Sequence, residues 1–283
     1  MQRILIPVLA VATVSLGART ATVGSTPAET VRKVYISVTD SKGVPAVDLT
    51  AADVTVKENG KPYPVASLEP AKAPMHIAIV VDDGGTGAFQ SAVAELLQKT
   101  FGKAQFRISM LTPQATTVID FTEETDGLKG AIGRLGLRGR QRASGDHLLT
   151  GVSEAAKALQ QRNAERPIIV VMTLGSGQAT EIDPKAVLST LRTSGASLNV
   201  LYFSGADIGE VMIDGPKQSG GRIEEANAGA PIAPAAGKLA EILLKQYVLT
   251  YKLPDGVKMS DKVAVETSRK GVTLTAPTRI PDK

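Results

Sequence analysis

The chain has 283 residues, of which 43% are hydrophobic, and it carries a formal net charge of +4. That length and apolar content can bury the core of one α/β domain and a smaller companion, which excludes a disordered or collagen-like chain. Cysteine is absent, which excludes disulfides and thiolate metal ligands, and with only 4% aromatic residues we expect no nucleic-acid partner.

The first 22 residues have the composition of a signal peptide followed by the start of a tail. Arg3 precedes an apolar run at residues 4–16, and small residues lie at the end of that run. The run has about 13 positions, fewer than the roughly 20 that a helix needs to cross a bilayer. We therefore expect cleavage within residues 1–22 and a secreted or periplasmic protein without a membrane span. A retained short anchor is the alternative.

The segment 31–70 is predicted to form a small N-terminal β unit. Apolar and polar residues alternate over residues 34–38, as on a strand with one buried face. The pair Asn59-Gly60 stands between two short β-prone runs, and this pair supplies the positive φ angles that a two-residue hairpin requires. We expect two or three short strands here.

Between residues 74 and 246, strands predicted to be buried alternate with amphipathic helices. Residues 167–173 are almost continuously apolar, which is typical of a parallel strand covered on both faces. The alternation predicts an α/β fold with a doubly wound, mostly parallel sheet. The predicted strands are 76–81, 106–111, 117–121, 167–173 and 197–203, and the predicted helices are 88–101, 146–159, 184–193 and 234–246.

The C-terminal segment 247–283 returns to a β pattern. Strands are predicted at residues 247–251, 262–267 and 272–276. Neither terminal segment has enough strands to form an independent sandwich. We therefore expect segments 31–70 and 247–283 to pair into one β module that the α/β domain interrupts.

The predicted first strand of the α/β domain leads into an unusual acidic and glycine-rich loop. Residues 76–81 followed by Asp82-Asp83-Gly84-Gly85-Thr86 resemble the first strand and metal-site loop of a von Willebrand factor A (VWFA) domain. The phrase at 43–60 resembles the leader of a bacterial VWFA-related family first described in acidobacteria, and residues 246–251 resemble its closing helix-to-strand junction. The resemblance covers residues 32–275 and implies a VWFA fold.

The resemblance also implies a metal-ion-dependent adhesion site, in which three loops hold Mg²⁺ and a partner's acidic group completes the octahedron. Here Asp82 and Thr86 match the first loop, but Gly84 stands where a serine is expected. Asp146 replaces the threonine of the second loop, and Leu174 replaces the aspartate of the third. The implied ligands, for Mg²⁺ or another divalent cation, are therefore Asp82, Thr86 and Asp146, and the site is degenerate.

A second interpretation of these residues needs no metal, and we favour it. Asp82 and Thr86 can cap the helix that follows their loop by accepting backbone N–H groups. Asp146 can do the same at the start of the next helix, where a carboxylate also interacts favourably with the helix dipole. No firm cofactor is therefore predicted.

A basic, glycine-rich loop precedes Asp146 and is expected to lie at the same edge of the sheet. We predict that Arg138, Arg140 and Arg142, together with Asp83 and His147, contact a partner. Guanidinium groups bind carboxylates and phosphates through paired hydrogen bonds, which fits such a role. The alternative is a loop that is merely solvated.

The main functional prediction is an extracytoplasmic protein–protein interaction or adhesion module that is not an enzyme and whose protein partner is unknown. The alternative is a structural scaffold component of a cell-envelope assembly. A third hypothesis is a hydrolase in which His147 and Asp146 act on substrate with Ser144 nearby. We give it the least weight, because adjacency in sequence does not establish the geometry of a catalytic triad.

Overall fold

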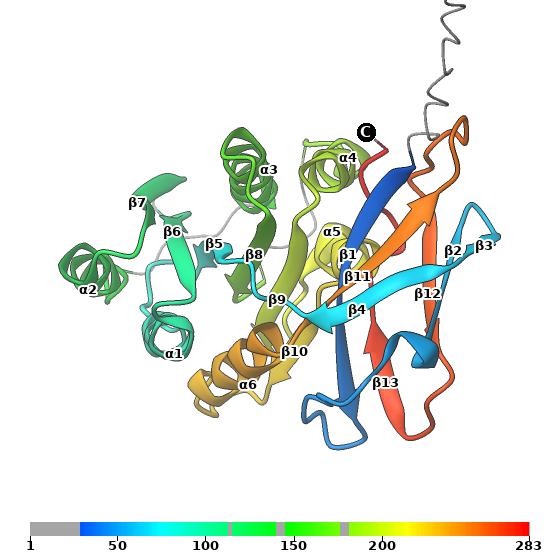
Figure 1. Cartoon of the computed structure of the whole chain (residues 1–283). Helices are drawn as coiled ribbons and strands as arrows, with labels where there is room; N and C mark the ends of the chain where they lie inside the picture. The colour runs from blue at the N-terminus through cyan, green and yellow to red at the C-terminus, as the bar shows by residue number, and fades with distance from the viewer. Residues whose placement is uncertain (1–28, 113–114, 140–144, 176–180, 283) are drawn as a thin grey trace, which may run out of the picture.

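The computed structural model describes residues 29–112, 115–139, 145–175 and 181–282. A six-stranded sheet with the order β10-β9-β8-β5-β6-β7 forms the centre of the α/β domain (Figure 1). Its pairs are parallel except for β6 and β7, which run antiparallel at one edge. The strands are β5 (Met75–Asp82), β6 (Ala104–Met110), β7 (Thr116–Thr122), β8 (Arg166–Thr173), β9 (Ser197–Phe203) and β10 (Ile223–Ala226).

Helices cover both faces of this sheet. Alternate residues of the central strands explain the arrangement, since Ile77 and Ile79 belong to one buried cluster and Ala78 and Val80 to another. The first cluster includes residues of α1, α2 and α6, and the second includes residues of α3, α4 and α5. The predicted doubly wound, mostly parallel sheet is confirmed. The helices are α1 (Gln90–Thr100), α2 (Thr125–Arg134), α3 (Gly145–Gln161), α4 (Pro184–Ser194), α5 (Gly209–Ser219) and α6 (Ala233–Leu244).

Three elements of the domain, α2, α5 and β10, were not predicted from the sequence. Helix α2 contains three glycines, which weaken its helical pattern, and it begins because the Glu124 side chain accepts hydrogen bonds from the backbone N–H groups of Asp126 and Gly127. Helix α5 contains Pro216, and β10 has only four residues. Short or proline-containing elements carry too little periodicity to be recognised.

The N- and C-terminal flanks interleave to form the β module. Strand β1 lies between β11 and β13, and β12 pairs with β2, so segments far apart in sequence are neighbours. The flanks form two sheets within this module, ordered β13-β1-β11-β4 and β12-β2-β3. The elements are β1 (Thr30–Asp40), η1 (Ala51–Asp53), β2 (Val54–Glu58), β3 (Lys61–Tyr63), β4 (Val65–Pro70), β11 (Tyr247–Leu253), β12 (Val263–Thr267) and β13 (Val272–Thr275).

The two sheets of the β module share one buried apolar cluster. Ile36 from β1, Val56 from β2 and Leu249 from β11 all belong to it. The predicted hairpin is confirmed: Asn59 and Gly60 join β2 and β3 with φ angles of 49° and 78°. The cluster thus draws apolar residues from both sheets.

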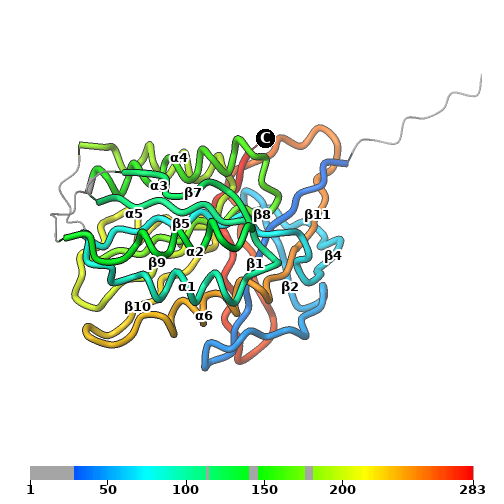
Figure 2. Tube along the Cα trace, turned by 90° about the vertical axis from the view of Figure 1, so that its left-hand side faces the viewer, coloured from blue at the N-terminus to red at the C-terminus, as the bar shows by residue number. Residues whose placement is uncertain are grey.

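Two ends of the α/β domain face different surroundings. The strands β5, β8 and β9 end at the edge drawn on the left of Figure 2, which we call the top edge. The β module lies at the opposite end, and we call the contact between the two parts the seam (Figure 2).

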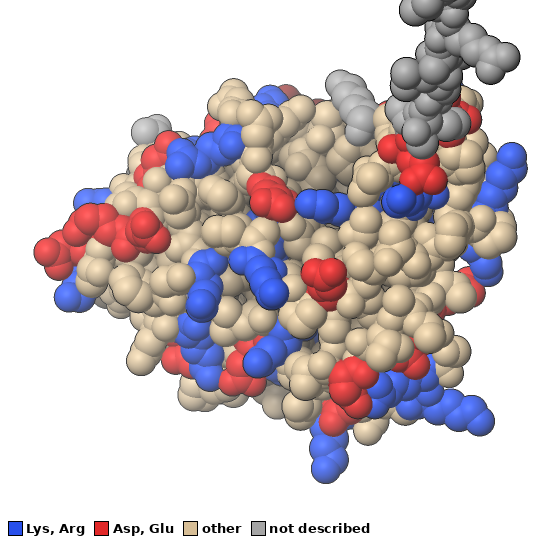
Figure 3. All heavy atoms as spheres, in the orientation of Figure 1, with Lys and Arg blue, Asp and Glu red and all other residues tan. Residues whose placement is uncertain are grey.

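On the face shown in Figure 3, basic and acidic side chains are interspersed. Within the described ranges, we find no helix that combines the length and the apolar character of a membrane span.

Candidate functional site

The buried carboxylate of Asp82 lies at the end of β5, at the top edge. It is 1% exposed, and its Oδ2 accepts a hydrogen bond of 2.8 Å from the Thr173 hydroxyl at the end of β8. The Asp82 backbone carbonyl accepts the N–H of Leu174 at 3.0 Å. Asp82 therefore ties the ends of two adjacent parallel strands together.

Asp83 anchors the loop that follows β5. Its fully buried carboxylate accepts the backbone N–H groups of Gly85 at 2.9 Å and Gly87 at 2.8 Å. The Nη2 of Arg138 donates to the same carboxylate at 2.7 Å, which makes a largely buried ion pair. Asp83 and Arg138 were both predicted to contact a partner, and the structure brings them into contact with each other.

Thr86 is engaged with the backbone of its own loop. Its hydroxyl donates to the Asp83 carbonyl at 2.7 Å and accepts the N–H of Ala88 at 3.3 Å. Helix α1 begins after Phe89, and no side chain caps its N-terminus. The expectation that Thr86 caps this helix is therefore wrong, because its hydrogen bonds lie before the helix, and the Asp82 side chain accepts a hydrogen bond from Thr173 of β8.

The loop at residues 136–139 packs directly against the Asp83 loop. The N–H of Arg138 donates to the Gly85 carbonyl at 2.9 Å. Gly85 has a φ of 78°, and a Cβ at this position would lie 2.2 Å from the carbonyl oxygen of Gly139, so only glycine allows this approach. The guanidinium of Arg138 turns back over the loop, while the neighbouring Leu137 side chain is 79% exposed.

The second predicted loop contributes Asp146 and His147 from the first turn of α3. The Oδ1 of Asp146 accepts the backbone N–H of Glu181 at 2.9 Å, so this carboxylate joins the start of α3 to the segment before α4. His147 is half-buried beside it. The remaining predicted residues of this loop, Arg140 and Arg142, and the serine of the hydrolase hypothesis, Ser144, lie outside the described residues.

The third loop places an apolar side chain where the resemblance implies a carboxylate. Leu174 is half-buried and packs against the cluster that covers the α1 and α6 face of the sheet. The hydroxyl of Thr173, one residue earlier, accepts the N–H of Gly175 at 2.9 Å while donating to Asp82. Residues 173–175 are thus held by packing and by hydrogen bonds within the chain.

The described residues of these loops do not present the ligand set of a Mg²⁺ site. A hard divalent cation needs about six oxygen ligands with near-octahedral geometry. The Oδ2 of Asp82 and the hydroxyl of Thr86 already take part in hydrogen bonds within the chain, and Leu174 offers no oxygen. Across the described parts of the chain, no three histidine, aspartate or glutamate residues gather at one point. The guanidinium of Arg138 supplies the positive charge beside Asp83.

Two features of the top edge were missed by sequence reasoning: the Asp83–Arg138 ion pair and the display of Leu137. Gly85 and Gly139 each lie in a loop that was predicted to reach this edge. The presence of a glycine in both loops is the signal that could have indicated their close packing. Which acidic residue would receive Arg138 could not be read from the sequence, because the two residues are 55 positions apart.

No protein-family model matches the chain, and no curated protein matches it either. Solved structures give likenesses of fold to von Willebrand factor A domains. The VWA domain of SpRpn10 is 12% identical with a TM-score of 0.42, and the matched region covers 59% of this chain and 93% of that one.

Two bacterial structures give similar values. BatB from Bacteroides thetaiotaomicron, described as a conserved hypothetical protein, is 11% identical with a TM-score of 0.44, covering 60% of this chain and 99% of that one. A von Willebrand factor type A protein from Catenulispora acidiphila is 10% identical with a TM-score of 0.46, covering 88% of this chain and 74% of that one. The likeness concerns the fold alone.

Proposed function

We propose that this protein is an extracytoplasmic protein-interaction module that binds its partner through the top edge without a metal ion. The observation that carries the proposal is Leu137, which is 79% exposed on a loop held at both sides. Arg138 fixes one side by its ion pair with Asp83, and Gly136 packs within 3.1 Å of where a Cβ on Gly87 would lie. The leucine is thus presented by an ordered backbone.

An apolar side chain on a rigid loop is suited to protein recognition. Burying a leucine side chain that is fully exposed contributes about 1.5–3 kcal/mol, and an ordered loop loses little conformational entropy on binding. The Asp83 carboxylate at this edge is already paired with Arg138 within the chain, so a partner need not supply an ion to neutralise it. The location outside the cytoplasm rests on the signal-peptide composition of residues 1–22, which lie outside the described residues.

The experiment is site-specific photo-cross-linking in cells that produce the protein, with a photoreactive phenylalanine analogue at Leu137. Phe101 is the matched control, because it is another exposed apolar residue, at 52%, and follows α1 at the end away from the top edge. We expect a cross-linked product from position 137 and none from position 101, with the same yield when a chelator is present. A cross-linked product from position 101 alone would contradict the proposal. Loss of the position-137 product when the chelator is present would contradict it as well.

A second candidate is the scaffold role, favoured by a different surface. Val44 and Val47, in the segment between β1 and η1 of the β module, are 56% and 61% exposed. The same photoreactive group at Val47 tests it. Products from position 47 without products from position 137 would favour a scaffold built through the β module.

We propose no catalytic role for His147 and Asp146. The Asp146 carboxylate is engaged by the Glu181 backbone, which supports a structural use of this group. A hydrolase screen that includes ester and peptide substrates, run on the wild-type protein and on His147→Ala, tests this. Activity that disappears in the variant would reverse the proposal.

A further inference from the structure

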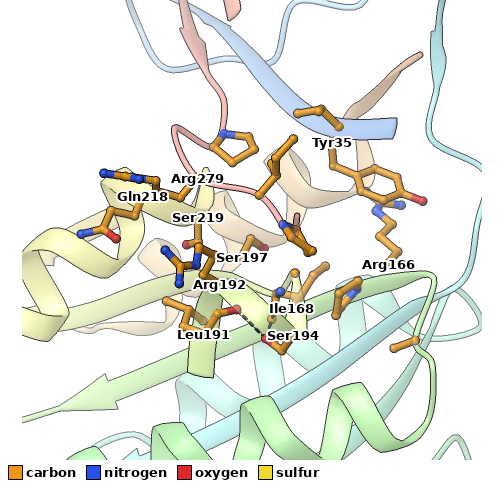
Figure 4. Close-up of a pocket in the computed structure, with 18 of the residues that line it drawn as sticks. Tyr35, Arg166, Ile168, Leu191, Arg192, Ser194, Ser197, Gln218, Ser219 and Arg279 are labelled. Carbon is orange, nitrogen blue, oxygen red and sulfur yellow. Dashed lines mark hydrogen bonds between the residues drawn. The ribbon is translucent and has the colours of Figure 1, made fainter. Parts of the chain in front are cut away.

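A cavity of about 270 Å³ lies in the seam, at the end of the α/β domain away from the proposed interaction surface. Its wall comes from β1, β8, α4, β9, α5 and the C-terminal segment (Figure 4). Ile168 and Leu191 line its middle part, and the prolines at 277 and 281 add further apolar surface. A cavity formed between two packed parts and lined mainly by apolar groups is typical of small-molecule sites.

Arg166, the first residue of β8, lies at one side of this cavity beside Tyr35 (Figure 4). It is 4% exposed, and its Nη2 donates to Oε1 of Gln246 at 3.0 Å and to the Leu243 carbonyl. The carbon of its guanidinium lies 5.6 Å from the centre of the Tyr35 ring. Burial lowers the pKa of Arg166 to about 10, so the charged form is disfavoured by its surroundings.

The charge of Arg166 is not neutralised by any carboxylate among the described residues. The Nη1 atom of Arg166 donates no hydrogen bond to any described residue; the hydrogen bonds of this guanidinium come from Nε and Nη2. The C-terminus of α6, which supplies the Leu243 carbonyl, carries a partial negative charge of roughly half a unit. This partial charge offsets only part of the full positive charge of Arg166. A buried cation that lacks a partner is costly to the fold, and this one borders an open volume.

The other ionic groups around the cavity do not supply the missing negative charge. Arg192 and Arg279 share a single carboxylate, that of Asp261, at 2.8 Å and 2.7 Å. The one acidic lining residue, Glu165, is paired with Lys33 at 3.6 Å. The cavity wall therefore carries more positive than negative charge, and its middle part is apolar.

We propose that this cavity binds a small organic carboxylate with an apolar body. The carboxylate accepts hydrogen bonds from the free side of the Arg166 guanidinium, and the body of the molecule packs on Ile168 and Leu191. A guanidinium donates to a carboxylate in a planar geometry, and a charge-assisted hydrogen bond in a desolvated site is strong. The apolar part contributes in proportion to the surface that it removes from water.

The test is isothermal calorimetry on the wild-type protein with hexanoate and with hexan-1-ol. The two probes have the same carbon chain and differ in whether the end group is charged. We expect hexanoate to bind at least about tenfold more tightly, because a hydrogen bond to a charged group is equivalent to an order of magnitude or more in affinity. Equal affinity for both probes, or no binding of hexanoate, would overturn the proposal.

Three variants locate the binding. Arg166→Met removes the charge and Ser197→Leu fills the cavity from β9 without changing any charge, and both are expected to weaken hexanoate binding at least about tenfold. Lys157→Met, an exposed position on α3, makes the same change of charge elsewhere and is expected to bind as the wild type does.

Circular dichroism and thermal melting establish that each variant is folded. Arg166 also joins β8 to the end of α6. If Arg166→Met does not fold, Ser197→Leu decides the matter. Unchanged affinity in a folded Arg166→Met protein, or in Ser197→Leu, would place hexanoate somewhere else and refute the proposed site.

Discussion

The top edge and the seam of this molecule treat buried charge in opposite ways. At the top edge, the buried carboxylate of Asp83 is met by two backbone N–H groups and by Arg138. At the seam, Arg166 is equally removed from water but contacts only a backbone carbonyl, an amide oxygen and a tyrosine ring. The Asp83–Arg138 pair therefore holds two loops together, whereas the Arg166 charge faces a cavity without a carboxylate partner among the described residues.

The contrast arises from how each region is assembled. The top edge consists of loops that follow consecutive elements of one sheet, so their side chains can complement one another at close range. The seam brings β8 and α4 of the α/β domain against β1 and the C-terminal segment, which come from the two ends of the chain. A site of this kind exists only because the flanks pair with each other.

The largest expected effect comes from breaking the ion pair at the top edge. Asp83→Asn is expected to lower the free energy of unfolding by about 3 kcal/mol, because it leaves Arg138 unpaired in a largely buried position. In a double-mutant cycle with Arg138→Met, measured by urea unfolding, the double variant should lose less stability than the sum of the single variants.

An exposed ion pair serves as the control for that cycle. Arg107 and Asp120 lie 2.8 Å apart, but the Asp120 side chain is 67% exposed. Asp120→Asn is expected to cost at most about 1 kcal/mol, as is typical of pairs in contact with solvent. Strict additivity in the Asp83 cycle, or a cost no larger than that of Asp120→Asn, would show that the top edge does not depend on its ion pair.

The second prediction concerns the close approach of two loops at the same edge. Gly85→Ala places a Cβ 2.2 Å from the Gly139 carbonyl oxygen at a φ of 78°, so we expect a cost of roughly 2–3 kcal/mol. Gly139→Ala is the matched control, because it has a φ of 92° but an added Cβ meets no atom within 4 Å. Its cost should be limited to the roughly 1–2 kcal/mol of the backbone conformation.

Thermal unfolding of the two glycine variants measures the difference. If both variants lose the same stability, the loops separate easily and Leu137 is not held in place. That outcome would also remove the support for the proposed interaction surface, because a mobile leucine would have to be ordered on binding.

Much of the architecture was predictable because its signals are local. Strand β8 (Arg166–Thr173) was predicted to within one residue, since a parallel strand buried on both faces is a nearly continuous apolar run. The Asn59-Gly60 hairpin followed from the φ angles that only a few residue types adopt easily. Helix α2 was missed because its three glycines interrupt the regular spacing of apolar residues that marks an amphipathic helix. The capping contacts of Glu124, which precedes the helix, are not part of that spacing.

The candidate sites were less predictable because they depend on contacts between distant residues. The sequence placed Asp82, Asp83 and Asp146 at one edge of the sheet, but not the partners that Thr173, Arg138 and Glu181 provide. Arg166 looks like an ordinary charged residue at the start of a strand. Its burial follows only when the flanking β module covers the end of β8, which is information from tertiary packing.

The third prediction, of a smaller effect, concerns how stability depends on pH at the seam, where Asp261 pairs with Arg192 and Arg279. Burial raises the pKa of Asp261, but the hydrogen bonds and charges of Arg279 and Arg192 outweigh it, so the pKa lies below the ordinary 3.8. A depressed carboxyl pKa contributes stability above 3.8 that is lost as the pH falls through the folded-state value. We expect Asp261→Asn to flatten this acid-side decline by less than about 1 kcal/mol, measured by urea unfolding.

The glycine variants provide a reference for the acid measurement. Gly139→Ala alters the top edge without changing a charge, so its stability should decline below 3.8 as steeply as that of the wild type. An unchanged decline in Asp261→Asn would mean that the two arginines do not hold this carboxylate, and the seam would then carry still more uncompensated charge than we infer.

The smallest expected effect is an absence of response to divalent cations at the top edge. A ligand that binds only the folded state stabilises it by an amount that grows with the logarithm of the ligand concentration above the Kd, so a working Mg²⁺ site would be visible in thermal unfolding and in calorimetry. Because the Asp82 and Thr86 oxygens take part in hydrogen bonds within the chain and Leu174 offers none, we expect neither a shift nor a heat of binding for Mg²⁺, Mn²⁺ or Ca²⁺ with chelator-treated protein. Binding that disappears in an Asp82→Ala, Asp146→Ala double variant would show instead that these loops rearrange around a cation, and recognition at the top edge would then be metal-dependent.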